Sequence, residues 1–235
     1  MSDDERRRMV RPPTGGMAQG RSLGQRLKTA EHRSLSSQQW LERQLNDPFV
    51  KEARAKGYRS RAAFKLLEID DRCKVIRKGA RVIDLGCAPG GWVQVALERG
   101  AGAVVGVDLL PTDPIGGAIL VQGDFTDPAC GPDLVALLGG PPDVVLSDMA
   151  PNTSGHRQTD HLRIVSLVEG AADFAAEVLK PDGTFVAKAF QGGEMAEALR
   201  MLKANFAEVR HVKPKASRAQ SSELYLVAKG FIPQR

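Results

Sequence analysis

The sequence is poor in the residues that hold metals and cross-links. Its three cysteines, Cys73, Cys87 and Cys130, are far apart, odd in number and without CxxC spacing. This usage argues against a disulfide framework or a zinc site and favours a reducing compartment. Only four histidines are present, and they form no His/Cys cluster. We therefore expect no metal site.

Long apolar runs are also missing. No stretch approaches the roughly 20 apolar residues that a membrane-spanning helix requires, so we expect no membrane contact. The first residues, MSDDERRRMVRPPTGG, are too polar for a signal peptide, and their acidic residues argue against an organelle transit peptide. These features together indicate a cytoplasmic protein.

Aromatic residues make up only 5% of the chain, whereas basic residues give it a formal net charge of +5. This balance favours a polyanionic partner that is bound through its phosphates rather than by base stacking. Residues 1–34 hold eight Lys/Arg against four Asp/Glu, and we interpret them as a basic disordered tail. The tail is either a solvated extension or a nucleic-acid-binding arm, and its composition favours neither.

Two further basic clusters lie at residues 51–65 and 210–218. Segments so far apart in sequence form one phosphate-binding surface only if the fold brings them together. The candidate phosphate-binding residues are Arg54, Lys56, Arg59, Arg61, Lys213, Lys215 and Arg218.

From residue 80 onward, short apolar runs alternate with segments of helical length. This alternation predicts a doubly wound, mostly parallel α/β sheet with helices on both faces. The predicted strands are 81–85, 103–108, 118–121, 143–147, 183–188, 207–212 and 224–228, the last two forming a hairpin at one edge. The predicted helices are 91–99, 128–138, 160–179 and 194–204, preceded by helical segments within 36–56 and 60–73. Residues 35–235 would form one domain.

The ligands of such sheets bind where parallel strands end. The first strand is followed by DLGCAPGGW, in which Gly86 permits a tight turn. Gly90 and Gly91 let a ligand approach the backbone at a helix N-terminus. The GxxxGG spacing differs from the GxGxxG of dinucleotide-binding loops.

Acidic residues follow the next two strands. Asp108 can accept both hydroxyls of a ribose, and Asp124 and Phe125 suit the amino group and ring of an adenine. Singly, each aspartate is more typical of a helix cap or a turn. In strand order, they predict a nucleoside site without a phosphate cradle, which S-adenosylmethionine fits better than NAD.

Lys188 interrupts an apolar run in GTFVAKAFQGG. Burying an ammonium group costs several kcal/mol unless it is paired or neutral. Taken alone, the pattern favours a lysine at a strand end that extends its charged head to water.

Several motifs occur in a fixed order: YRSRAAFKLLEI, DLGCAPGGW, VDLLPTDPI, QGDFTD, SDMAPNTSG, VAKAFQGG and SRAQSSELYLVAKG. As a set they resemble the FtsJ-type (RrmJ) ribosomal RNA 2′-O-ribose methyltransferases, from about residue 36 to the C-terminus. The resemblance implies a seven-stranded, Rossmann-like methyltransferase sheet with one antiparallel strand. It also implies S-adenosylmethionine as cofactor and no metal. The longer N-terminal tail departs from the shorter forms of the family.

The resemblance further assigns roles to individual residues. It implies a catalytic tetrad of Lys65, Asp148, Lys188 and Glu223. It implies cofactor contacts by Gly90, Trp92, Asp108 and Asp124, with Asp148 between methyl donor and acceptor. The implied substrate is a uridine in the A loop of large-subunit (23S) ribosomal RNA, within the assembling or assembled subunit. The implied enzyme acts as a monomer.

This chemistry accounts for Lys188. Methyl transfer needs an oxygen nucleophile in line with the methyl group, and a ribose hydroxyl is a poor acid. Burial and the charge of Lys65 favour the neutral amine of Lys188, whereas Asp148 opposes it. Lys188 could then accept the hydroxyl proton, with Glu223 orienting the lysines or the ribose. In the alternative, Lys188 stays charged and only orients the ribose.

Two other classes share parts of the pattern. A nicotinamide-dependent dehydrogenase would need a phosphate loop, which the GxxxGG spacing argues against. A non-catalytic RNA chaperone that binds the cofactor could dispense with the tetrad. Within methyltransferases, the same tetrad also serves transfer-RNA and cap ribose methylation, so the substrate stays open from sequence alone.

Overall fold

The computed structural model describes residues 46–151, 157–191, 195–218 and 221–233, with side chains described from residue 162 onward in the helix that begins at residue 157. The predicted basic tail at 1–34 and the start of the predicted domain at residue 35 lie outside the described residues. Residues Asp47–Arg235 form one unit that contains the whole sheet.

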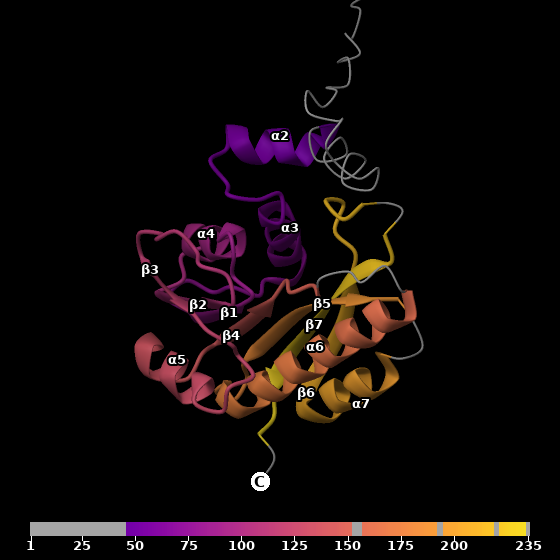
Figure 1. Cartoon of the computed structure of the whole chain (residues 1–235). Coiled ribbons are helices and arrows are strands. Elements are labelled where there is room, and N and C mark those ends of the chain that lie inside the picture. Colours follow the sequence, from indigo (N-terminus) through magenta and orange to yellow (C-terminus); the bar gives the residue numbers. More distant parts are fainter. Residues whose placement is uncertain (1–45, 152–156, 192–194, 219–220, 234–235) are drawn as a thin grey trace, which may run out of the picture. The chain divides into compact units, whose positions relative to one another are not determined.

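Seven strands form one sheet in the order β3-β2-β1-β4-β5-β7-β6 (Figure 1). Their bounds are β1 Arg81–Leu85, β2 Ala103–Asp108, β3 Ala118–Gln122, β4 Val144–Ser147, β5 Thr184–Phe190, β6 Phe206–Val212 and β7 Glu223–Phe231. All neighbouring pairs are parallel except those of β7, which is antiparallel to both β5 and β6. This confirms the doubly wound sheet with one antiparallel strand. The strand order reverses between β1 and β4, the place where such sheets bind their ligands.

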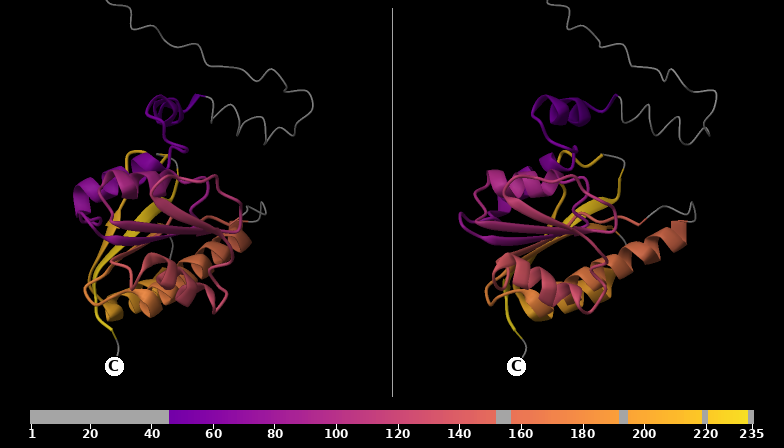
Figure 2. Two further views of the ribbon diagram at one scale, coloured as in Figure 1. Left: turned by 90° about the vertical axis from the view of Figure 1, so that its left-hand side faces the viewer. Right: turned by 60° about the vertical axis from the view of Figure 1, so that its left-hand side comes forward.

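Helices cover both faces of the sheet, as predicted (Figure 2). They are α2 Pro48–Ala55, α3 Ala63–Cys73, α4 Gly91–Glu98, α5 Cys130–Leu138, α6 Arg157–Val178 and α7 Ala196–Asn205. Successive strand residues point to opposite faces. Val82 accordingly packs in the core that contains α3 and α4, whereas Ile83 packs in the core of α5, α6 and α7.

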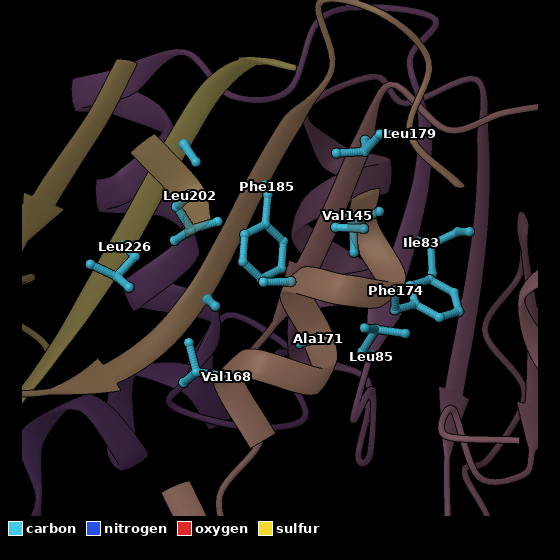
Figure 3. Close-up of a cluster of buried hydrophobic side chains, with 14 of the residues drawn as sticks. Ile83, Leu85, Val145, Val168, Ala171, Phe174, Leu179, Phe185, Leu202 and Leu226 are labelled. Carbon is cyan, nitrogen blue, oxygen red and sulfur yellow. The ribbon is translucent and has the colours of Figure 1, made fainter. Parts of the chain in front are cut away.

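Figure 3 shows the core between the sheet and helices α5, α6 and α7. Val145 and Phe185 of the sheet lie near Ala171 and Phe174 of α6, and Leu202 of α7 closes the cluster. Burying such side chains stabilises the fold by about 25 cal/mol for each Å² removed from water. Because this apolar layer fixes the strands in register, it also fixes the side chains at the strand ends.

The two strands around Lys188 are longer than predicted. β5 continues past Lys188 to Phe190, and β7 begins at Glu223, so that Lys188 pairs with Tyr225. Lys188 therefore lies within a strand and not at its end. The reason is that β7 pairs with β5 beyond the point where its parallel neighbour β4 ends at Ser147. The predicted hairpin is formed by β6 and β7, with β6 at the edge of the sheet.

The predicted absences can be compared with the described part of the chain. No helix in it is both long and apolar enough to cross a membrane. Nor do its His, Cys, Asp and Glu side chains form a group of three that could hold a metal ion.

Candidate active site

The four residues of the predicted tetrad come together at the end of the sheet where the parallel strands finish. Asp148 directly follows β4, Lys188 lies on β5, and Lys65 lies on α3. Glu223 is the first residue of β7, and because β7 is antiparallel to β5, this residue lies where β4 and β5 end. The topology therefore unites segments that are far apart in sequence.

Ion pairs connect all four side chains. Lys188 Nζ lies 3.1 Å from Asp148 Oδ1 and donates a hydrogen bond of 2.6 Å to the Asp148 carbonyl oxygen. Lys65 Nζ lies 2.8 Å from Glu223 Oε1 and 3.8 Å from Asp148 Oδ1. The side chains are 8–16% exposed. Two cations and two anions thus balance in a nearly buried site, as the cost of burying charge requires.

Tyr225 stands at the centre of this cluster, although the sequence analysis did not select it. Its hydroxyl donates to Asp148 Oδ1 at 2.5 Å and lies 3.5 Å from Glu223 Oε1, and Lys65 Nζ lies 5.5 Å from its ring centroid. The residue is fully buried. Burial, reinforced by the charges of Asp148 and Glu223, raises the pKa of Tyr225 well above its ordinary value, so it stays a donor. Its sequence signal was its spacing of two residues from Glu223, which places both on one face of a strand.

Glu223 is held as a carboxylate. Burial alone would raise its pKa, but the positive charge and hydrogen bond of Lys65 outweigh burial, with help from Ser217. The net result is a pKa below the ordinary value for glutamate. The Ser217 hydroxyl donates to Glu223 Oε1 at 2.8 Å, which fixes the carboxylate toward Lys65.

Asp84 is a second residue that the sequence analysis passed over. It lies on β1 and is 1% exposed, and neither of its carboxyl oxygens has a hydrogen-bond partner among the described residues. Burial, together with the charges of Asp148 and Asp108, raises its pKa well above the ordinary value. A carboxyl group within the apolar run RVIDL was its signal, the same kind of signal that drew attention to Lys188.

The glycine loop after β1 is tightly packed. Gly90 has a φ of +109°, which L side chains rarely adopt, and caps α4. A Cβ on Gly86 would overlap Met149, which follows Asp148, and a Cβ on Gly91 would overlap the Ser60 hydroxyl. The loop therefore approaches both the tetrad and the segment before α3.

The predicted nucleoside residues line the neighbouring strand ends. Asp108 accepts the backbone N–H of Ala88 at 2.9 Å and that of Leu110 at 2.8 Å, so it connects the glycine loop to the loop after β2. Asp124 is exposed and accepts both the N–H and the hydroxyl of Thr126. The backbone hydrogen bond from Thr126, followed by that from its hydroxyl, lowers the pKa of Asp124.

The two predicted aromatic residues pack into the protein. Phe125 is half-buried and forms an edge contact with Phe174 of α6, at a centroid distance of 6.4 Å. The Trp92 ring is buried, lies 5.6 Å from the ring of Tyr225, and donates its indole N–H to the Ala62 carbonyl. Trp92 thus supports the tetrad from behind, and its indole donor is already used.

The fold joins the two basic clusters. The Arg61 guanidinium pairs with Asp47 and donates to the Ala216 carbonyl, and the backbone N–H of Lys215 donates to Glu68. Arg61 is therefore committed to contacts within the protein. The Arg59 guanidinium donates to three backbone carbonyls near the glycine loop.

The other predicted phosphate-binding residues are more open. Arg54 and Lys215 are exposed, and Arg218 is 40% exposed and lies 3.9 Å from Asp47. Lys56 pairs with Glu52 at the surface, and Lys213 Nζ donates to the Ser221 carbonyl. A further set of cations surrounds a hollow of about 770 Å³ at the opposite edge of the sheet, where the strands begin: Arg77, Lys78, Arg81 and Lys180.

The chain is similar to known methyltransferases. Residues 58–231 match the family described as FtsJ-like methyltransferase. Two relatives, each named ribosomal RNA large subunit methyltransferase E, come from Caulobacter sp. (strain K31) and Gluconobacter oxydans. The first is 65% identical over 95% of this chain and 99% of the relative, and the second is 60% identical over 89% and 78%. A crystal structure from Plasmodium falciparum, named a ribosomal RNA methyltransferase, is 32% identical with a TM-score of 0.68, and the match covers 75% of this chain and all of that one. With its sheet, its glycine loop and these similarities taken together, the chain is a methyltransferase and belongs to the FtsJ-like methyltransferase family.

Proposed function

We propose that this protein uses S-adenosylmethionine to methylate the ribose 2′-hydroxyl of a nucleotide in large-subunit ribosomal RNA, with a uridine of the A loop as its target. The names of the Caulobacter and Gluconobacter relatives support this class of substrate. One observation supports the reaction above all others. Two lysines and two carboxylates meet at the carboxyl edge of the sheet, beside a glycine loop of the family.

The residues present suit this cofactor. S-adenosylmethionine carries positive charge on its sulfonium and ammonium groups and supplies the methyl group when bound. The buried Asp84 carboxyl has no partner of its own, and it interacts unfavourably with the charges of Asp108 and Asp148. A cationic ligand beside three carboxyl groups would offset their repulsion. NAD would instead bring phosphate charges to the same place, which would increase it.

The remaining contacts follow from the strand ends. Asp108 would accept hydrogen bonds from the ribose, and Asp124 from the adenine amino group, with Phe125 beside the base. Gly86, Gly90 and Gly91 let the side chains of Met149, Ile115 and Ser60 pack directly against the backbone of the first loop, which shapes that wall of the proposed site.

The tetrad would prepare the acceptor hydroxyl. In its neutral form, Lys188 Nζ would take up the hydroxyl proton, and Asp148 would hold the amine through the two hydrogen bonds that it accepts from it. Lys65, fixed by Glu223, lies 3.8 Å from the same Asp148 oxygen that Lys188 contacts, and so helps to hold that carboxylate in place. Because both lysines are nearly buried and paired, the reacting groups are positioned before the substrate arrives.

The joined basic clusters would bind RNA phosphates. Arg54, Lys56, Lys213, Lys215 and Arg218 are the side chains that we assign to this surface. Arg61, although predicted with them, would act indirectly by holding the two segments together. The proposed enzyme acts in the cytoplasm, as a monomer, on the assembling or assembled large subunit.

Substitution of Lys188 tests the mechanism. With large ribosomal subunits from cells that lack the gene, Lys188→Ala should lower the single-turnover rate by roughly 10²–10⁴-fold. Lys188→Arg should not restore it, since a guanidinium remains protonated. Affinity for S-adenosylhomocysteine should remain near wild type in both. Lys78→Ala, which removes a lysine at the opposite edge of the sheet, is the control. Partial rescue by arginine would show that Lys188 orients the ribose and accepts no proton.

Mapping the methylated nucleotide tests the substrate. Ribosomal RNA from cells without the gene should lack one 2′-O-methyl group in the A loop, and the purified protein should restore it. If the missing methyl group lies on transfer RNA or on another nucleotide of ribosomal RNA, the assigned target is wrong, although the chain still belongs to the methyltransferase family.

A further inference from the structure

Arg59 makes an unusual set of contacts for a residue in a basic cluster. Its Nη1 donates to the carbonyl oxygens of Pro89 at 3.2 Å and Asp113 at 2.5 Å, and its Nη2 donates to that of Pro114 at 2.7 Å. No carboxylate pairs with its guanidinium among the residues that the structure describes. One side chain therefore joins two loops that are separated in sequence.

These two loops are the walls of the proposed cofactor site. Residues 86–90 form the glycine loop, and residues 109–117 follow Asp108 at the end of β2. A Cβ placed on Gly90 would lie 3.3 Å from both Cδ and Nη1 of Arg59 and would overlap Ile115. The glycine loop, the Arg59 side chain and the second loop are thus in direct contact.

The segment that carries Arg59 is itself anchored. The Gln94 side chain, from the first turn of α4 after the glycine loop, accepts the backbone N–H of Arg59 at 2.8 Å. The amide of the same side chain donates to the Gly57 carbonyl at 2.9 Å. Arg59 is therefore held at its backbone by α4 and at its guanidinium by the two loops. Such over-determined positions are typical of residues that support a site from behind.

The geometry points to Arg59 as a positioning residue of the cofactor site, rather than a contact to RNA phosphate. We propose that its guanidinium sets the distance between the glycine loop and the loop after Asp108, and so shapes the space for the nucleoside. Three carbonyl acceptors at different positions require the forked donors of arginine, and a lysine ammonium on a flexible stem cannot reproduce them. This inference rests on the proposed binding of S-adenosylmethionine to these loops.

Arg59→Lys and Arg59→Met test the proposal. The readouts are the dissociation constant for S-adenosylhomocysteine by calorimetry, the KM for S-adenosylmethionine against kcat, and the salt dependence of binding to a short RNA hairpin. We expect Arg59→Met to weaken S-adenosylhomocysteine binding and to raise KM by about 10- to 100-fold, as for the loss of charge-assisted hydrogen bonds. Arg59→Lys should rescue this only partly. The salt slope of RNA binding and kcat at saturating cofactor should stay near wild type.

Arg54→Met is the matched control, because Arg54 is exposed and lies in the same basic cluster. It should leave cofactor affinity unchanged and reduce the log–log salt slope by about one, the effect of one lost phosphate contact. If Arg59→Lys and Arg59→Met bind S-adenosylhomocysteine like wild type, the positioning role is wrong. A reduced salt slope would then assign Arg59 to RNA.

The melting temperature of the variants separates a folding defect from a cofactor-site defect, and binding of S-adenosylhomocysteine to the wild type tests the proposed function itself. If the melting temperature of Arg59→Met falls below the assay temperature, the cofactor affinity of Arg59→Lys, which keeps the charge, decides whether Arg59 positions the cofactor site. A merely structural role would lower the melting temperature without changing the KM of the folded variant, and that result would overturn the inference. If the wild-type protein itself fails to bind S-adenosylhomocysteine, the proposed function is wrong and the inference falls with it.

Discussion

Replacing Asp84 by asparagine should make the protein more stable and a poorer binder of its cofactor. The carboxyl group is almost completely buried, neither oxygen has a partner among the described residues, and its pKa is raised by burial and by the charges of Asp148 and Asp108. Leaving a buried polar group unsatisfied costs about 1–3 kcal/mol, and more when it is charged. Asparagine has the same shape and carries no charge, so it removes the charge-dependent part of this cost.

The direction of the Asp84 pKa shift fixes how the difference in stability between Asp84→Asn and wild type should change with pH. A carboxyl group whose pKa is raised by folding stabilises the folded state below its ordinary pKa, and this contribution is lost as the pH rises through the folded-state value. Relative to wild type, Asp84→Asn should therefore be about equal in stability near pH 4 and about 1–3 kcal/mol more stable near pH 7. Urea unfolding across this range measures the difference.

The same variant should bind S-adenosylhomocysteine about 3- to 10-fold more weakly, because the ligand's ammonium group would no longer relieve the repulsion of Asp84 by Asp148 and Asp108. Asp70→Asn is the control. Asp70 is equally buried, but it accepts the backbone N–H of Ile76 and lies 3.4 Å from the Arg99 guanidinium. Its replacement should destabilise the protein by about 1–3 kcal/mol at neutral pH. If Asp84→Asn also destabilised the protein at neutral pH, the account of Asp84 as an uncompensated charge would be refuted.

The cluster around Asp148 and the proposed nucleoside site yield three more expectations. Tyr225→Phe removes the hydroxyl that donates to Asp148, so kcat should fall about 10- to 100-fold with little change in cofactor affinity, and unchanged kcat would remove Tyr225 from the site. Because the pKa of Glu223 is lowered by folding, its stabilising contribution is present above the ordinary glutamate pKa and is lost in acid. The stability of wild type should therefore fall more steeply than that of Glu223→Gln between about pH 6 and 3, and parallel curves would contradict this. Asp108→Ala should weaken S-adenosylhomocysteine binding by about 1–3 kcal/mol in calorimetry, and an unchanged affinity would exclude Asp108 from the cofactor site.

Much of the fold could be predicted from periodicity and from the residues that follow each strand. Buried parallel strands appear in sequence as short, nearly continuous apolar runs, which is why β1, β2 and β4 were predicted within a residue of their bounds. The ends of β5 and β7 were missed, because only pairing between these two strands extends them, and pairing is a property of the fold. Lys188 thus proved to lie within a strand.

The roles of the basic residues were harder to predict. Arg54, Arg59 and Arg61 look alike in sequence, yet one is exposed, one donates to loop carbonyls and one pairs with Asp47. A charge count cannot separate these cases, since the difference depends on which acceptors the tertiary structure places nearby. Tyr225 was missed for a related reason, because a tyrosine in an apolar strand is normally part of the core.

The position of β7 has a consequence for synthesis of the protein on the ribosome. β7 is the last strand to be made, yet it lies between β5 and β6 and carries both Glu223 and Tyr225. A nascent chain that ends before residue 223 already contains the five parallel strands and the loops around Asp108. It still lacks the partner of Lys65 and the hydroxyl that binds Asp148. If the proposed tetrad carries the reaction, activity would therefore appear only when the final strand has been made.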